Sequence, residues 1–385
     1  MTRLPDVVTL RRDLHAHPEL GFAEKRTTEL VGEYLSALGL EPRTLPGGTG
    51  VVCDIGTSGP VVGLRADIDA LPITDLKDVP YRSTVEGTCH GCGHDAHTAI
   101  LLAAAAQLSR RSLPGRVRLI FQPAEETLPG GALAVLESGE LDGVSRIFAL
   151  HCDPRLETGS IGVRPGPITA ACDRLEVALT GPGGHTARPH LTAELVYAAG
   201  LIITELPGLL SRRVDPRAAL SLVWGSVQAG GAANAIPMVG SVRGTLRVFD
   251  RDAWAAAGPL VTELVDQIVA PTGVQATTDY VRGVPPVVND GPSVELQSTA
   301  VVTALGKQAL AETSQSMGGE DFAWYLGTIP GALARLGVRR AGGAAFDLHQ
   351  GTFDIDEAAL DVGVRYTVEL ALRALAAQNR STPRH

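Results

Sequence analysis

The feature of this sequence that most constrains its fold is the order of elements between Cys172 and Val281. Hydrophobic patterning there predicts a strand, a helix, two strands, a helix and a last strand. A complete β-α-β-β-α-β run is the signature of a ferredoxin-like unit, which can fold as a domain by itself. The expected strands are Arg174–Leu179, Ala219–Val227, Gly240–Val248 and Gln275–Val281, and the expected helices are Ala193–Leu206 and Ala253–Val269.

The segments on either side of this run alternate helical and strand patterns, which favours an α/β domain with a mixed, mainly parallel sheet. Several of its strands are nearly continuous apolar runs, as expected for a sheet covered on both faces. At 385 residues the chain also exceeds the usual size of one core. We therefore expect a discontinuous α/β domain over 1–168 and 283–385, with an inserted ferredoxin-like α+β domain over 169–282. Pro/Gly-rich joints lie near both crossings, at Arg164–Pro167 and Gly283–Pro286.

Composition excludes several classes of protein. The net charge is −9 and the basic residues are scattered, whereas a nucleic-acid binding face needs clustered Lys and Arg, so we expect no nucleic-acid partner. The sequence offers no evident secretion signal and no stretch that we expect to span a membrane. Its five cysteines form an odd, sparse set, which fits a reducing compartment better than a disulfide framework. These features favour a cytoplasmic enzyme.

A metal site is indicated by the hexapeptide Cys92–His97, which precedes an alanine-rich helical pattern. A thiolate and an imidazole two residues apart can reach one ion if the glycine between them bends the chain. Short Cys/His clusters also occur as buried thiols beside a capping histidine, so the hexapeptide alone leaves both interpretations open.

Three more motifs place reactive side chains where apolar strands end, which is where open α/β sheets build their sites. Each has an ordinary explanation by itself: capping aspartates, a solvated glutamate pair, and a core histidine. Adjacent carboxylates repel unless cations share them, so a glutamate pair at the end of a buried strand indicates a metal. The motifs are Leu64–Pro72 with Asp67 and Asp69, Phe121–Glu126 with Glu125 and Glu126, and Ala149–Pro154 with His151.

Cys92, His94, Glu126 and His151 share one expected sheet edge, which makes coincidence the weaker explanation. Over nearly its full length the chain resembles the amidohydrolase branch of the dinuclear metallopeptidases, which contains aminoacylases, hippurate hydrolases and indole-acetyl-amino-acid hydrolases. The resemblance is carried by an ordered set of motifs, namely LHAHPELGFAE from Leu14, LRADIDALP, HGCGHDAHT from His90, FQPAEE, ALHCDP, GGHTARPH from Gly183, NAIP from Asn234, GTLR from Gly244, GGEDFAWYL from Gly318 and FDLHQGTF from Phe346.

The resemblance implies a centre with two divalent metal ions and Glu125 as the general base. Five protein ligands exceed what one catalytic zinc ion takes, so two ions that share a bridging thiolate and a water are physically sensible. A thiolate favours Zn²⁺, carboxylate and imidazole ligands also accept Mn²⁺, and Co²⁺ and Ni²⁺ are further candidates. The implied ligands are Cys92, which would bridge the ions, His94, Glu126, His151 and His349.

The same resemblance implies supporting roles for other residues. Asp69 would orient the ligands, with Asp95 or His97 as weaker candidates for that role. His185, from the inserted domain, would contact the substrate and stabilise the oxyanion, in some relatives from a second subunit. Asn234 and Arg247 would hold the substrate carboxylate, a task to which a guanidinium is suited.

The implied activity is metal-dependent hydrolysis of the amide bond of N-acyl amino acids or related small amides. The inserted domain would serve as a lid and as the contact surface of a homodimer. One alternative is a dipeptidase or carboxypeptidase of the same superfamily. A second is a non-catalytic small-molecule binding protein, although such a protein would not need a base beside the ligands. A third is catalysis by a nucleophilic Cys89 or Cys92. The last leaves the implied ligands Glu126, His151 and His349 unexplained.

Two positions depart from the family pattern. Cys89 stands where relatives carry methionine, and Gly319 replaces a serine, which removes a hydroxyl near the implied site. The same motif contains Glu320 and Asp321, which could also cap the start of a helix. Neither departure changes an implied ligand.

Overall fold

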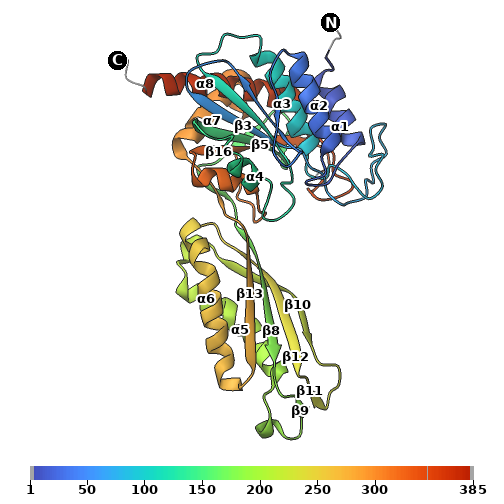
Figure 1. The fold of residues 1–385 in the computed structure, drawn as a ribbon, viewed down its shortest axis with the longest axis vertical. Coiled ribbons are helices and arrows are strands. Elements are labelled where there is room, and N and C mark those ends of the chain that lie inside the picture. The colour runs from blue at the N-terminus through green and yellow to red at the C-terminus, as the bar shows by residue number, and fades with distance from the viewer. Residues whose placement is uncertain (1–3, 345, 382–385) are drawn as a thin grey trace. The chain divides into compact units, whose positions relative to one another are not determined.

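The structure is a computed structural model that describes residues 4–344 and 346–381 (Figure 1). Its internal contacts divide the chain into two compact units. The first comprises Met1–Gly166, Val288–Ser314 and Asp321–His385, and the second comprises Pro167–Val287 and Gln315–Glu320. The second unit thus includes a short late segment, Gln315–Glu320, which the sequence pattern assigns to the α/β domain over 283–385.

The first unit is built on an eight-stranded mixed sheet with the order β1-β2-β4-β3-β5-β16-β6-β15. The central strands β4, β3, β5 and β16 run parallel to one another, while the β1–β2, β2–β4 and β16–β6 pairs are antiparallel. This confirms the predicted α/β class. The strands are β1 (Arg43–Thr44), β2 (Val51–Ile55), β3 (Val61–Asp67), β4 (Arg116–Gln122), β5 (Val144–Glu157), β6 (Ile161–Val163), β15 (Leu310–Glu312) and β16 (Gly331–Arg339).

The helix that follows the Cys/His hexapeptide, α3 (His94–Leu108), is buried along almost its whole length. Alanine and leucine favour the helical backbone, and an apolar surface on all sides suits a central helix. It packs on β3 and β5 and between α1 and α8 (Figure 1). The other helices are α1 (Val7–Ala16), α2 (Lys25–Ala37), α4 (Ala132–Glu137), α7 (Gly291–Leu305) and α8 (Ala358–Ser381), with short 3₁₀ segments η4 (Lys307–Ala309) and η5 (Asp321–Gly327).

The register of the parallel strands decides where functional side chains meet. β3 and β4 end together, because Asp67 pairs with Gln122 at the last position of their ladder. β5 continues past the end of β3, whose pairing with β5 stops at Arg65 and Ala149. The side chains that follow β3 and β4 therefore lie beside the part of β5 that carries His151, at one edge of the sheet.

The second unit has the predicted β-α-β-β-α-β order, with a four-stranded antiparallel sheet in the order β10-β12-β8-β13. A small hairpin-like pair, β9 with β11, is separate from this sheet (Figure 1). Its elements are β8 (Cys172–Thr180), β9 (Gly184–His185), η1 (Pro189–Leu191), α5 (Leu195–Arg213), η2 (Pro216–Ala218), β10 (Ser221–Ala229), β11 (Ala235–Ile236), β12 (Val239–Arg247), α6 (Arg251–Val269), η3 (Ala270–Thr272) and β13 (Gln275–Val284), and the strands β7 (Gly166–Thr169) and β14 (Val287–Asn289) lie where the chain crosses between the units.

One helix contradicts the expectation from sequence that no stretch could span a membrane. Among the described residues, α5 is long and apolar enough to do so by length and composition. However, α5 packs on β10, β12 and α6, and it buries Ala198, Ile202 and Leu206 along one side. Burial of one apolar stripe is how a helix behaves in a globular domain, so we assign α5 to the core of the second unit.

Candidate metal centre

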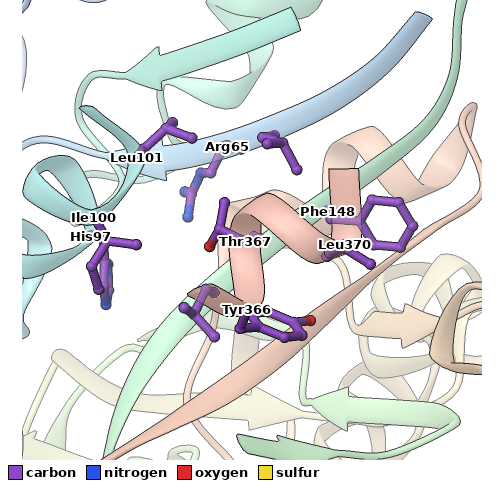
Figure 2. Close-up of a pocket in the computed structure, with 11 residues that line it drawn as sticks. Arg65, His97, Ile100, Leu101, Phe148, Tyr366, Thr367 and Leu370 are labelled. Atoms are coloured by element: carbon purple, nitrogen blue, oxygen red, sulfur yellow. The ribbon is translucent and has the colours of Figure 1, made fainter. Parts of the chain in front are cut away.

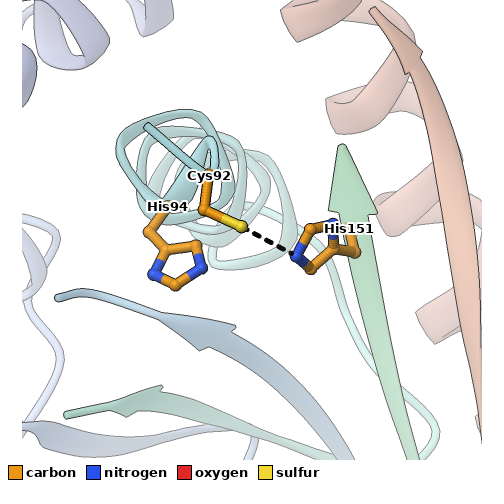
Figure 3. Close-up of side chains that lie close together, drawn as sticks. All are labelled: Cys92, His94 and His151. Carbon is orange, nitrogen blue, oxygen red and sulfur yellow. Dashed lines mark hydrogen bonds between the residues drawn. The ribbon is translucent and has the colours of Figure 1, made fainter. Parts of the chain in front are cut away.

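The five expected ligands come together in the first unit from four separate segments, since Cys92 and His94 share one. Two groups of three ligand atoms form, each with its atoms within 4.8 Å of one another. The first group is Cys92, His94 and His151 (Figure 3), and the second is Cys92, Glu126 and His349. Cys92 belongs to both groups and is the one residue that they have in common.

Gly93 explains how Cys92 and His94 reach the same point. Its φ of 90° lies in the left-handed region that favours glycine, and it caps the start of α3. A Cβ at this position would lie only 2.8 Å from Cys152 Sγ. Glycine is therefore required both by the backbone and by the neighbouring strand β5.

Hydrogen bonds fix the two buried histidines of the first group so that Nε2 faces inward. His94 Nδ1 lies 3.0 Å from the Asp69 carbonyl oxygen and 3.1 Å from Asp69 Oδ1, and His151 Nδ1 lies 2.8 Å from the Cys152 carbonyl oxygen. Each Nδ1 thus donates to a carbonyl oxygen, so Nε2 is the ring nitrogen available to a metal ion. His151 Nε2 lies 3.6 Å from Cys92 Sγ (Figure 3), and His94 Nε2 is buried with no hydrogen-bond partner among the described residues.

The turn after β4 supplies Glu125 and Glu126. The backbone N–H of Glu126 donates to Asp69 Oδ2 at 2.9 Å, so the carboxylate of Asp69 contacts both a histidine ligand candidate and the glutamate pair. Glu125 Oε2 lies 3.9 Å from His94 Nε2, and Glu126 Oε1 lies 4.0 Å from the same atom. Asp69 is thus placed to orient both sides of the centre.

His349 enters from the far end of the chain. Its backbone N–H donates to the Gly91 carbonyl oxygen at 2.8 Å, which ties its loop to the loop of Cys92. Its Nε2 lies 3.2 Å from Glu126 Oε1, and this contact raises the pKa of His349. The backbone of His349 has a φ of 62°, an uncommon value for a residue with a side chain.

The charge balance of the centre suits cations. Burial lowers the pKa of His94, but the carboxylates of Asp67, Asp69 and Glu126 outweigh it and raise the pKa to about 10. Burial, together with Glu126 and Glu125, holds the pKa of the Cys92 thiol well above its usual value. Thiol, imidazole and carboxylate donors that converge with an unpartnered Nε2 fit divalent metal ions, and ions there would offset the clustered negative charge.

The raised pKa of Cys92 also argues against nucleophilic catalysis by this residue. Its contact with His151 resembles a Cys-His pair, but a reactive cysteine needs a lowered pKa. Cys89 is buried, and burial raises the pKa of its thiol to about 11. Neither cysteine has the environment of an activated nucleophile.

Two residues of the hexapeptide have other partners. His97 Nδ1 lies 2.5 Å from Asp67 Oδ1, and His97 Nε2 accepts from the Cys152 backbone N–H at 2.8 Å, so both ring nitrogens are engaged. Asp95 accepts from Arg11 at 2.8 Å and lies 2.6 Å from His15 Nδ1. Both residues brace the centre and do not face it.

Sequence reasoning missed the supporting role of Asp67 and Asp321. Asp67 holds His97 and accepts from Arg65 at 2.6 Å. The alternating carboxylates of Leu64–Pro72 are the sequence feature that could have revealed this role of Asp67. Asp321 is fully buried and accepts from Arg65, from Gln122 and from the Ala132 N–H at the start of α4. It anchors its loop to β3 and β4.

The three expected substrate residues lie in the second unit. His185 on β9 pairs with Ala235 on β11, and its Nδ1 accepts from the Ala187 N–H at 3.0 Å. The Thr186 N–H donates to the Asn234 carbonyl oxygen at 3.3 Å, so His185 and Asn234 are neighbours. Arg247 ends β12 and donates to the Met317 carbonyl oxygen.

A small cavity in the first unit is not the substrate site. It lies between β3, β5, α3 and α8 and is lined by residues that include Arg65, His97, Phe148 and Tyr366 (Figure 2). Its volume is about 20 Å³, which is room for a single water molecule.

Comparison with known proteins defines the class. Residues 63–373 match peptidase family M20/M25/M40, and the chain belongs to this family. It is 38% identical to the Bacillus subtilis YXEP protein, a structure described as a dinuclear metal binding peptidase from the M20 family, with a TM-score of 0.85 and coverage of 96% of this chain and 97% of that one.

Two sequence relatives narrow the class. The chain is 40% identical over 374 residues to N-acetylcysteine deacetylase of Bacillus subtilis (strain 168), covering 96% of this chain and 97% of that protein. It is 52% identical over 365 residues to a Rhodococcus jostii (strain RHA1) protein named "Putative glutamate--cysteine ligase 2-3", covering 94% of this chain but only 46% of that protein. The chain is therefore an enzyme of the amidohydrolase type within its family, as its motifs predicted.

Proposed function

We propose that this enzyme hydrolyses the amide bond of N-acyl amino acids at a centre of two divalent cations, with Glu125 as general base. The observation that carries the proposal is the pair of ligand groups that share Cys92, with Glu125 beside them. When bound, the two cations would polarise the amide carbonyl and acidify a water, and Zn²⁺ and Mn²⁺ fit the mixed thiolate, imidazole and carboxylate donors, with Co²⁺ and Ni²⁺ as further candidates.

Glu125 is the proton carrier in this proposal. Its carboxylate is mostly buried and lies within 4 Å of His94 Nε2, close enough to take a proton from a water held at the centre. The same carboxyl then donates that proton to the departing nitrogen. The neighbouring Glu126 acts as a metal ligand in this proposal and not as the base, because its Oε1 lies beside His349.

The second unit supplies substrate contacts in the proposal. His185 would donate to the oxyanion, and Asn234 and Arg247 would hold the carboxylate of the substrate. These three assignments come from the family resemblance, and the accessible positions of His185 and Asn234 are compatible with ligand contact.

We propose N-acyl-L-cysteine as the first substrate class to test, because N-acetylcysteine deacetylase, which the chain matches over 97% of that protein's length, is named for such a substrate. With Zn²⁺- or Mn²⁺-loaded enzyme we expect the highest kcat/KM for N-acetyl-L-cysteine, in a panel with N-acetyl-L-leucine, hippurate, an indole-acetyl amino acid and dipeptides. Amino acid release measured by mass spectrometry checks this. Faster cleavage of dipeptides would favour the peptidase alternative, and no hydrolysis of any panel member would contradict the proposed function.

We further propose a homodimer formed through the second unit. β10 is an edge strand of its sheet, and the sheet exposes Val223, Val227 and Val239, an arrangement that invites pairing with a second copy. Light scattering is expected to give twice the chain mass of 40.2 kDa, and Val223→Glu is expected to give the monomer mass. Val302→Glu, on an exposed apolar position of α7, is the matched control and should remain dimeric. A monomeric wild-type protein would contradict this proposal.

A further inference from the structure

We propose that Glu24 is a positioning residue that sets the backbone of the turn carrying Glu125 and Glu126. The inference rests on the proposed function, because it concerns the residue that precedes the proposed base. Glu24 lies outside both ligand groups and immediately before α2.

The turn has an unusual backbone. Ala124 has a φ of 53°, in the left-handed region that residues with a Cβ rarely adopt. The Gly131 N–H donates to the Ala124 carbonyl oxygen at 2.9 Å, and a Cβ on Gly131 would lie 1.9 Å from the Pro123 carbonyl oxygen. Because a left-handed residue redirects the chain sharply, the conformation of Ala124 decides where Glu125 starts.

Glu24 holds this conformation from the other side. Its side chain is fully buried, and its Oε1 accepts from the Ala124 N–H at 2.7 Å. The preceding turn packs directly on the same segment, since a Cβ on Gly21 would lie 2.9 Å from Thr127 Cγ2 and 3.1 Å from Ala124 Cα. The Ala70 N–H donates to the Glu19 carbonyl oxygen at 2.8 Å, which links this brace to the strand end that carries Asp69.

A carboxylate in this place is costly for the fold. Within the part of the chain that the structure describes, Oε2 of Glu24 is buried with no hydrogen-bond partner, and the side chain makes no capping bond to α2. Burial raises the pKa of Glu24 to about 7, and the nearby Asp69 carboxylate adds to this, while backbone N–H groups act in the opposite direction. A buried carboxylate that accepts a hydrogen bond from the residue before Glu125 at 2.7 Å is explained by control of that turn.

The test compares Glu24→Ala with Glu24→Gln. The alanine removes the acceptor, and we expect kcat to fall about 10²-fold with little change in KM, as for a small misplacement of a reacting group. The glutamine oxygen can still accept the Ala124 N–H, so most of kcat should be retained. Zn²⁺ affinity, measured by competition with a chromophoric chelator, should fall for Glu24→Ala, because Glu126 leaves the same turn.

Asp290→Ala is the matched control. The Asp290 carboxylate also accepts a backbone N–H, that of Ser293 at 3.0 Å, but it caps α7 and bonds Arg146 near the start of β5, away from the ligand edge. We expect Asp290→Ala to lower the thermal midpoint without a change in kcat or Zn²⁺ affinity.

Unchanged kcat and Zn²⁺ affinity in Glu24→Ala would overturn the proposal, as would equal losses in the alanine and glutamine variants. If Glu24→Ala does not fold, hydrogen exchange in the wild-type protein decides: the Ala124 amide should be strongly protected, and rapid exchange would overturn the inference. If the wild-type enzyme hydrolyses no N-acyl amino acid, the proposed function fails, while the affinity and exchange measurements still judge Glu24.

Discussion

Replacing Glu125 with glutamine is expected to lower kcat for N-acyl amino acids by about 10²–10⁴-fold, the usual contribution of a general base. Glutamine has nearly the same shape but cannot accept the proton. In free energy this is about 3–5 kcal/mol of lost transition-state stabilisation. Metal content, measured by mass spectrometry of the purified protein, should stay at the wild-type level because Glu125 is not one of the five proposed ligands.

Two further variants make the Glu125 result specific. Glu126→Gln should lower both metal content and kcat, since Glu126 belongs to the group of Cys92 and His349. Glu137→Gln, at an exposed glutamate on α4, should leave both unchanged. A Glu125→Gln enzyme that keeps kcat within about threefold of wild type would remove Glu125 from the role of base.

Removal of the shared sulfur should have the broadest effect on the centre. Cys92→Ala deletes a ligand from both groups at once, so we expect the affinity for both ions to fall by more than about 10²-fold. The comparison is with a residue that only hydrogen-bonds to a ligand, whose loss already lowers metal affinity about 10–100-fold. Hydrolysis should fall with it. Metal content after dialysis and Zn²⁺ competition measure the first effect, and kcat at saturating metal measures the second.

Cys92→Asp supplies an oxygen donor at the same position and should recover part of the metal binding. Cys53→Ala removes another buried thiol, in β2, that contacts no ligand, and it should lower stability without loss of metal. Full metal content in Cys92→Ala would show that the two ligand groups do not depend on a shared sulfur.

Much of the fold follows from local pattern. The β-α-β-β-α-β run of the second unit and the alternation in the first were predictable because periodicity and turn residues act over a few positions. The segment Gln315–Glu320 was not, because its assignment to the second unit depends on contacts such as that between Arg247 and Met317, 70 residues apart.

The candidate site was only partly predictable from the residues themselves. Glu126 and His151 follow from strand-end motifs, because parallel strands bring such ends to one edge, and Cys92 follows from the Cys/His hexapeptide. His349 entered only through the family pattern, since its loop joins the centre through a backbone bond to Gly91 that no local pattern encodes.

By itself, the sequence determined which donor atoms the centre has available, because thiol, imidazole and carboxylate groups are properties of residue type. Only the tertiary structure decided which of them face one point. That choice depends on strand register, on the left-handed backbones of Gly93, Ala124 and His349, and on bonds that fix each histidine tautomer. These are long-range constraints, and they are why His94 faces the centre while its neighbours Asp95 and His97 brace it.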